Sequence, residues 1–300
     1  MTKCPVCRAP FGPAAFAELA DHFLAESDRS DPGHVRFLNQ TISKHRMDRA
    51  ALADRFEELF RLPPEGLAAW IRARFIARFF GPRLHPFVEA LQYPNRPTLL
   101  GYVVEHQHFL REWVRCCAFV LAKSDRAEVA AYELDNIRTE YVGEGPTVPS
   151  HYELLLRMGE SYGVDRATIL GTAPLPTTAR TLAEWHEICE KEHWVEGMAA
   201  MHSLELIAHR DLLRYGATVH YFDPEILEGT AITDPAKAFL REGYEADVGH
   251  ADEALALVER FAGELGRVEE VQGTFLRSLD LFDDYLGARL QRGDEYGSSA

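Results

Sequence analysis

The chain has 300 residues, of which 46% are hydrophobic and 26% are charged, and its formal net charge is -15. This length and composition predict one large soluble domain with a sizeable core, with or without a small appendage. The acidic balance argues against nucleic acids and anionic membranes as main partners, because both repel a negative surface.

The N-terminal part is predicted to be an appendage followed by helices. Residues 1–33 contain a CPVC sequence, several prolines and one short apolar segment, and we expect them to form the appendage. After it, apolar residues recur at helical spacing. The first clear amphipathic helix covers residues 48–61, with Asp48 as its N-cap, and a second covers residues 65–80.

The remaining chain is predicted to be helical as far as residue 290. A turn-rich stretch is expected at residues 215–234, and a disordered tail at residues 291–300. No alternating pattern typical of strands has a useful length, so the fold class is all-α, with a helical bundle over residues 34–290. The further helices are expected at 98–122, 126–142, 150–162, 166–171, 181–214, 235–262 and 267–290. A kink near Gly197 is left open for the long helix 181–214.

The cysteines and the N-terminus predict a cytoplasmic protein. The chain opens without an apolar stretch of signal-peptide length and lacks an apolar run that would span a bilayer. Its five cysteines are an odd number with no disulfide framework, which favours reduced thiols: Cys4, Cys7, Cys116, Cys117 and Cys189.

Helix 98–122 carries ionisable residues although it is apolar on nearly all sides. Glu105, His108 and Glu112 are spaced i, i+3 and i+7 and therefore share a face. A helix of this kind is usually buried, and a buried carboxylate is either paired or bound to a metal. Taken alone, the stripe favours a solvent-facing surface or an internal salt bridge.

The sequence MHSLELIAH repeats this spacing with His202, Glu205 and His209. Glutamate and histidine on helical faces form the iron sites of carboxylate-rich bundles, although a solvated polar face would have the same pattern. Asp247 and His250 are spaced i and i+3, a pair that is frequent by chance.

The CPVC sequence gives Cys4 and Cys7 the spacing of half a zinc ribbon. A second CxxC is missing, and His22 or His34 could complete a zinc site, although the spacing does not require it. A redox pair and an absence of function stay open as alternatives.

The order of these segments resembles the heme-oxygenase-like superfamily, which includes the PQQ-cofactor synthase, thiaminase-II-type proteins and the non-heme diiron oxidases. The stretch HPFVEALQ…TLLGYVVEHQHFL is similar to its first core helices, and DNIRTEYVGEG…SHYELL to its Asn-Ile-x-x-Glu, turn, His segment. MHSLELIAH resembles the helix that supplies a further glutamate. FLREGYEADVGHADEAL resembles the closing helix, whose metal motif is His-x3-Asp-x2-His. The resemblance covers roughly residues 85–262.

The resemblance implies a set of metal ligands, with Glu140 as the carboxylate able to bridge two irons. Gly243 departs from the motif, because it stands where the family has its first histidine. Three outcomes are therefore possible: a single metal, a weak second site, or a substitute ligand. The candidates for the substitute ligand are His202, His209 and His108. The ligands carried over from the family are Glu105, Glu140, His151, Glu205, Asp247 and His250.

The resemblance further implies an O2-dependent oxidase with one or two iron ions, acting on a small amino-acid-like or carboxylate substrate. The expected reactions are N-oxygenation, desaturation or oxidative C–C cleavage, as part of a biosynthesis. Arg115, Arg138 and Arg241 lie near the motifs and could pair with a substrate carboxylate, although surface arginines would look the same. An electron donor and a homodimer are open expectations.

Two rival interpretations remain. The first is a metal-free enzyme on the same fold, such as a PQQ-synthase-like or thiaminase-like protein, of which the latter needs a nucleophile from Cys116, Cys117 or Cys189. The second is a non-enzymatic helical interaction protein with the CPVC arm as a zinc-stabilised docking element.

Overall fold

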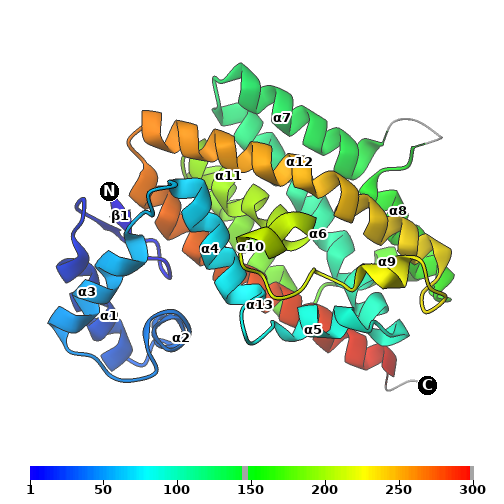
Figure 1. The fold of residues 1–300 in the computed structure, drawn as a ribbon, viewed down its shortest axis with the longest axis horizontal. Helices are drawn as coiled ribbons and strands as arrows, with labels where there is room; N and C mark the ends of the chain where they lie inside the picture. Colours follow the sequence, from blue (N-terminus) through cyan, green and yellow to red (C-terminus); the bar gives the residue numbers. More distant parts are fainter. Residues whose placement is uncertain (144–147, 298–300) are drawn as a thin grey trace.

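The computed structural model describes residues 1–143 and 148–297, without the side chains of residues 245–248. The all-α prediction is confirmed: helices make up nearly all of the regular structure (Figure 1). The exception within the described ranges is one short antiparallel hairpin of β1 (Thr2–Lys3) and β2 (Pro10–Phe11). The turn of this hairpin contains the CPVC sequence.

The hairpin begins an N-terminal unit that lies at one end of the molecule, drawn in blue in Figure 1. Aspartate N-caps start two of its helices, because Asp31 accepts a hydrogen bond from the His34 N–H and Asp48 from the Ala51 N–H. Phe23 stacks on neighbouring aromatic rings in its core. The helices that follow the hairpin here are α1 (Phe16–Asp28), α2 (Pro32–Phe37), η1 (Leu38–Ile42) and α3 (Arg49–Phe60).

The main bundle follows, and its longest helices pack lengthwise. Helix α6 packs along α13, while α11 lies against both α12 and α13. The elements in chain order are α4 (Leu67–Phe79), α5 (Pro86–Gln92), α6 (Arg96–Lys123), α7 (Ala127–Ile137), η2 (Arg138–Val142), α8 (His151–Ser161), α9 (Arg166–Gly171), α10 (Pro176–Lys191), α11 (Trp194–His202), η3 (Ser203–Ile207), η4 (Arg210–Tyr215), η5 (Pro224–Leu227), α12 (Asp234–Glu264) and α13 (Val268–Gly297).

The contact between α6 and α13 depends on glycine. A Cβ atom at Gly101 would lie 2.1 Å from the carbonyl oxygen of Arg289 and 2.5 Å from the backbone nitrogen of Gly293. No side chain fits at this distance, so the two backbones can approach only because Gly101 has none. This contact fixes where the side chains of α13 lie relative to α6.

Two predicted elements were wrong. The single helix expected at residues 181–214 is divided into α10, α11 and the 3-10 turns η3 and η4. The break falls at Glu192, and His193 caps the new helix by accepting a hydrogen bond from the Val195 N–H. The tail was expected to be disordered from residue 291, but α13 continues to Gly297, and Arg292 and Gly293 are buried against the start of α6.

Among the described residues, no helix combines the length and the apolar character needed to cross a bilayer.

Candidate active site

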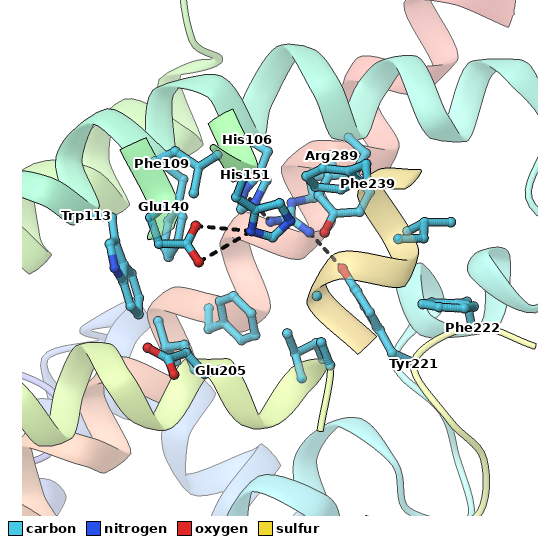
Figure 2. A pocket seen from close by; sticks show the side chains of 18 residues that line it. His106, Phe109, Trp113, Glu140, His151, Glu205, Tyr221, Phe222, Phe239 and Arg289 are labelled. Atoms are coloured by element: carbon cyan, nitrogen blue, oxygen red, sulfur yellow. Dashed lines mark hydrogen bonds and ion pairs between the residues drawn. The ribbon is translucent and has the colours of Figure 1, made fainter. Parts of the chain in front are cut away.

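A cavity of about 70 Å³ lies inside the main bundle, between α6, α8, α12 and α13 (Figure 2). Its walls are mainly aromatic and aliphatic, with a few ionisable groups. Such an apolar cavity with a small number of converging polar groups is the usual form of a small-molecule site. The lining side chains include Tyr102, His106, Phe109, Trp113, Glu140, His151, Glu205, Tyr221, Phe239, Phe282 and Arg289.

Glu140 and His151 meet on one wall although they belong to different helices. A π-helical turn, η2, ends α7 and buries Glu140, while Ser150 caps α8 and places His151 in its first turn. Nδ1 of His151 lies 3.1 Å from Oε2 of Glu140 and 3.4 Å from Oε1. Both residues are 9% exposed. Oε2 of Glu242 lies 3.6 Å from the same nitrogen, so a second carboxylate among the described side chains also approaches this imidazole.

Glu205 forms part of the opposite wall, and its carboxylate contacts polar groups that lie outside the cavity. Its Oε1 accepts from the Asn136 amide at 3.1 Å and lies 2.9 Å from Nδ1 of His202. The second nitrogen of His202 lies 2.9 Å from Glu133. Burial alone would lower the pKa of His202, but the two carboxylates outweigh it and raise the pKa to about 10. The imidazolium therefore fixes the orientation of Glu205.

His106 and Arg289 line the cavity and were not among the predicted site residues. Nδ1 of His106 accepts a hydrogen bond of 2.8 Å from Nη2 of Arg289. Burial and the neighbouring guanidinium lower the pKa of His106 well below its usual value, so the ring is neutral. His106 follows Glu105 directly in the sequence, and its place within the apolar helix was the only available signal.

The structure does not bring Glu105 to the cavity. Its Oε1 accepts from Nε of Arg292 at 2.7 Å and its Oε2 from the Leu175 N–H at 3.2 Å. Glu112, on the same stripe, lies 2.6 Å from Nδ1 of His186. The internal salt bridge that was left open for this stripe is therefore what the structure contains.

The remaining predicted histidines also lie elsewhere. His202 is behind the cavity wall, in contact with Glu205 rather than with the cavity. His209 is buried with Nε2 3.4 Å from Asp252. Nε2 of His250 lies 3.9 Å from Asp135, near the surface. The side chain of Asp247 is outside the described residues.

None of the three arginines predicted for substrate binding lines the cavity. Arg115 is 67% exposed and pairs with Glu112. Arg241 pairs with Glu228 across the surface, and Arg138 is exposed on η2.

The cysteines of the main bundle are buried away from the cavity, and no cysteine occurs among its described lining residues. A hydrogen bond to Cys189 and burial raise the pKa of Cys116 well above its usual value, and burial does the same for Cys117. Thiols in this state are poor nucleophiles.

A second cluster lies in the N-terminal unit, where the two cysteines of the hairpin meet two histidines. The ligand atoms of Cys4, Cys7, His22 and His34 all lie within 4.8 Å of one another. Sγ of Cys4 is 3.4 Å from Nε2 of His34, and Sγ of Cys7 is 3.3 Å from Nε2 of His22. Two thiols and two imidazoles that point at one centre form the usual ligand set of a structural zinc. The two histidines that were alternatives in the sequence thus both reach the site.

The chain is thus a helical bundle that encloses a small cavity lined by glutamate, histidine and aromatic residues. The sequence profile of the TENA/THI-4/PQQC family matches residues 70–292, and the chain therefore belongs to this family. A C2H2-type zinc-finger profile matches residues 1–61, which include the four-residue cluster. No curated protein matches the chain.

Solved structures show the same fold. One is a domain of unknown function with a heme oxygenase-like fold from Shewanella denitrificans OS217, at 17% identity and a TM-score of 0.58, covering 77% of this chain and 93% of that one. A TenA family transcription regulator from Silicibacter sp. TM1040 has 16% identity and a TM-score of 0.57, covering 75% and 96%. A TenA homolog from Pseudomonas syringae pv. tomato has 14% identity and a TM-score of 0.56, covering 75% and 91%.

Proposed function

We propose that this protein is an O2-dependent oxidase or oxygenase that acts on a small organic molecule at a non-heme iron in the cavity. The observation that carries the proposal is the buried Glu140–His151 pair on the wall of an otherwise apolar cavity. A few buried polar groups that converge on an otherwise apolar cavity are the usual form of a small-molecule site.

The donor atoms at this wall fit iron. A carboxylate oxygen and an imidazole nitrogen suit iron or manganese better than soft metals. Glu140 and His151 would hold the ion, and the nearby Glu242 offers a further carboxylate. Glu105 is bound to Arg292, away from the cavity, and Gly243 has no donor, so neither adds a ligand for a second ion at this wall. We therefore favour one metal over two.

When bound, iron would supply the reduction of dioxygen and the oxidation of the substrate. The residues of the chain have the other tasks. Phe109, Phe239 and Phe282 exclude water and leave space for an apolar substrate. Glu205, fixed by His202 and Asn136, presents a carboxylate to the substrate from the opposite wall.

The thiaminase-like alternative has less support. It needs a cysteine nucleophile at the cavity, and the lining residues that the structure describes include none. Iron content distinguishes the present proposal from a metal-free oxidase of the PQQ-synthase type.

We also propose that the N-terminal cluster binds a structural zinc ion. The convergence of four ligand atoms supports this assignment, since lone pairs that face one another at 3.1–3.4 Å are favourable mainly when a cation lies between them. The finger-like unit would then be a folded element attached to the catalytic bundle.

Iron stoichiometry tests the function. The protein is reconstituted anaerobically with ferrous iron, desalted and analysed for iron and zinc separately. We expect about one iron per wild-type chain, and its loss in Glu140→Gln and in His151→Ala, because each variant removes one donor. Oxygen uptake on exposure to air should be lost with the iron.

Glu112→Gln is the matched control, because it removes a glutamate of α6 that lies away from the cavity and should leave the iron content unchanged. Wild-type protein without iron, or the same stoichiometry in both cavity variants, would overturn the proposal. A Cys7→Ser variant should lose zinc and keep iron, which separates the two sites.

A further inference from the structure

Arg289 is a completely buried arginine of α13 that lines the cavity. Its Nη1 donates to the Tyr221 hydroxyl at 2.9 Å, and its Nη2 donates to Tyr285 at 3.0 Å and to Nδ1 of His106 at 2.8 Å. Its Nε–H has no hydrogen-bond partner. The acceptors are two phenol oxygens and an imidazole nitrogen, and none of them is a carboxylate.

Two other arginines that reach the interior of the bundle face carboxylates. Arg292, one turn further along α13, pairs with Glu105 at 2.7 Å, and Arg78 pairs with Asp280 at 2.6 Å. Within the part of the chain that the structure describes, Arg289 has no carboxylate at ion-pair distance. A buried charge without a counterion is strongly unfavourable, so a position that retains one commonly provides it for a ligand.

The charges of the cavity are separated along its length. Glu140 and Glu205 lie at the end near Trp113, while Arg289 and Tyr221 lie at the other end (Figure 2). Aromatic and aliphatic side chains form the walls between them. A ligand with an anionic group and an apolar body would fit in one orientation, with the anion at Arg289 and the body directed toward Glu140 and His151.

From this arrangement we infer that Arg289 is the anchor for the carboxylate of a small, apolar organic acid. Guanidinium and carboxylate groups match in geometry and charge, and the Nε–H is the guanidinium donor that has no hydrogen-bond partner. Tyr221, which also lines the cavity, would add a hydroxyl at the same end. The inference rests on the proposed function only for what happens to the acid afterwards, since the binding itself needs no metal.

A purely structural role for Arg289 makes a different prediction. Its guanidinium lies over the rings of Tyr102 at 4.1 Å, Tyr285 at 4.5 Å and Phe87 at 5.2 Å. These stacks explain how the core tolerates the cation. If they were its whole purpose, substitution would lower stability and would not distinguish an acid from its amide.

Binding to metal-free protein tests the inference. Calorimetric titrations use acetate, butyrate and benzoate, each compared with its neutral amide, and inorganic phosphate as the competing anion. We expect at least one acid to bind about tenfold or more tightly than its amide, because charge-assisted hydrogen bonds are lost with the charge. The acid should also raise the melting temperature of the wild-type protein, and the amide should not.

Variants locate the site. Arg289→Gln and Arg289→Lys should weaken binding of the acid about tenfold or more and leave binding of the amide unchanged, since lysine retains the charge but loses the planar donors. Arg292→Lys, on the same helix and in its own ion pair, should bind like the wild type. If Arg289→Gln does not fold, the inference is still tested by the lysine variant and by the comparison of acid with amide in the wild type.

Equal affinity for acids and amides, no binding of any acid, or wild-type binding in the lysine variant would each overturn the inference. Phosphate that binds more tightly than all three acids would overturn the carboxylate assignment. Iron content is measured separately. If the protein binds iron but no acid, the proposed function is retained and this inference is overturned. If it binds acids but no iron, this inference is retained and the proposed function is overturned.

Discussion

His202 lies fully buried between two carboxylates, with Nε2 2.9 Å from Glu133 and Nδ1 2.9 Å from Glu205. Cys117 and Tyr132 are its other titratable neighbours, and their raised pKa values keep both neutral. Because the folded pKa of His202, about 10, is above the usual 6.5, its charge stabilises the fold fully below pH 6.5. The contribution is lost as the pH rises toward 10.

We therefore predict that His202→Gln lowers the free energy of unfolding by about 3–5 kcal/mol near neutral pH, as expected when one partner of a buried ion pair is removed. The wild-type free energy of unfolding should also fall between pH 6.5 and pH 10, and the variant should lose most of this slope. Urea denaturation across this range measures both quantities.

His186→Gln is the control for this experiment, because His186 is partly exposed on α10 and bonded to Glu112. It should retain the wild-type slope. A His202→Gln protein whose stability depends on pH as the wild type does would show that the charge of His202 is not part of the fold.

The sequence predicted individual site residues unevenly. Glu140 and His151 were assigned through the resemblance, and the structure places them together. Glu105 was assigned to the same site, but the structure pairs it with Arg292. The residues that share a helix face with Glu105 do not reveal this partner, because Arg292 lies far along the chain. Arg289 gave no signal, because an arginine in an amphipathic helix is usually a surface residue and only packing shows that it is buried.

At the scale of elements, the approach of α6 to α13 positions the cavity. Gly101 contacts the backbone of Arg289 and Gly293, so the same contact that joins the helices also holds the proposed anion anchor. We predict that Gly101→Ala lowers the free energy of unfolding by about 1–3 kcal/mol, because the added methyl group must push the helices apart. It should also weaken the binding of an organic acid.

Gly287→Ala is the matched control within α13. A Cβ atom there meets nothing within 4 Å, so the substitution should be neutral or stabilise the helix by up to about 1 kcal/mol. Thermal and urea denaturation compare the two variants. Equal stability of Gly101→Ala and Gly287→Ala would contradict the requirement for a glycine at the contact.

The elements themselves were largely predictable, and their interruptions were not. Apolar spacing indicated helices such as α3, α6 and α12 close to their observed bounds. The prediction of a helix at residues 181–214 was wrong because the chain breaks at Glu192. No proline or glycine marks this break in the sequence, so it is determined by tertiary packing. The 3-10 turn η3 keeps His202 close to Glu205, and a continuous helix would do the same. The sequence pattern alone therefore could not distinguish the 3-10 turn from a continuous helix.

At the scale of the whole molecule, the N-terminal unit is attached to the bundle through charged contacts. Lys3 lies 2.6 Å from the fully buried Glu196, and Arg36 donates to Asp283 at 3.1 Å and also contacts Asp284 on α13. The backbone of Lys3 also lies close to Gly273 of α13. The proposed zinc ion would therefore hold the hairpin that carries Lys3 and, through it, one end of α13.

This arrangement predicts a specific effect of zinc removal. His22→Gln, or a chelator applied to the wild type, should remove about one zinc per chain and lower the melting temperature by a few degrees. Limited proteolysis should then cut first within residues 1–60. His45→Gln, which alters an exposed histidine of the same unit outside the cluster, should retain zinc and resist cleavage.

Because the cavity is built by other helices, the iron content of a zinc-free His22→Gln protein should stay at the wild-type value. Unchanged zinc content in His22→Gln would exclude the four-residue site, whereas loss of both metals would show that the N-terminal unit supports the cavity through α13.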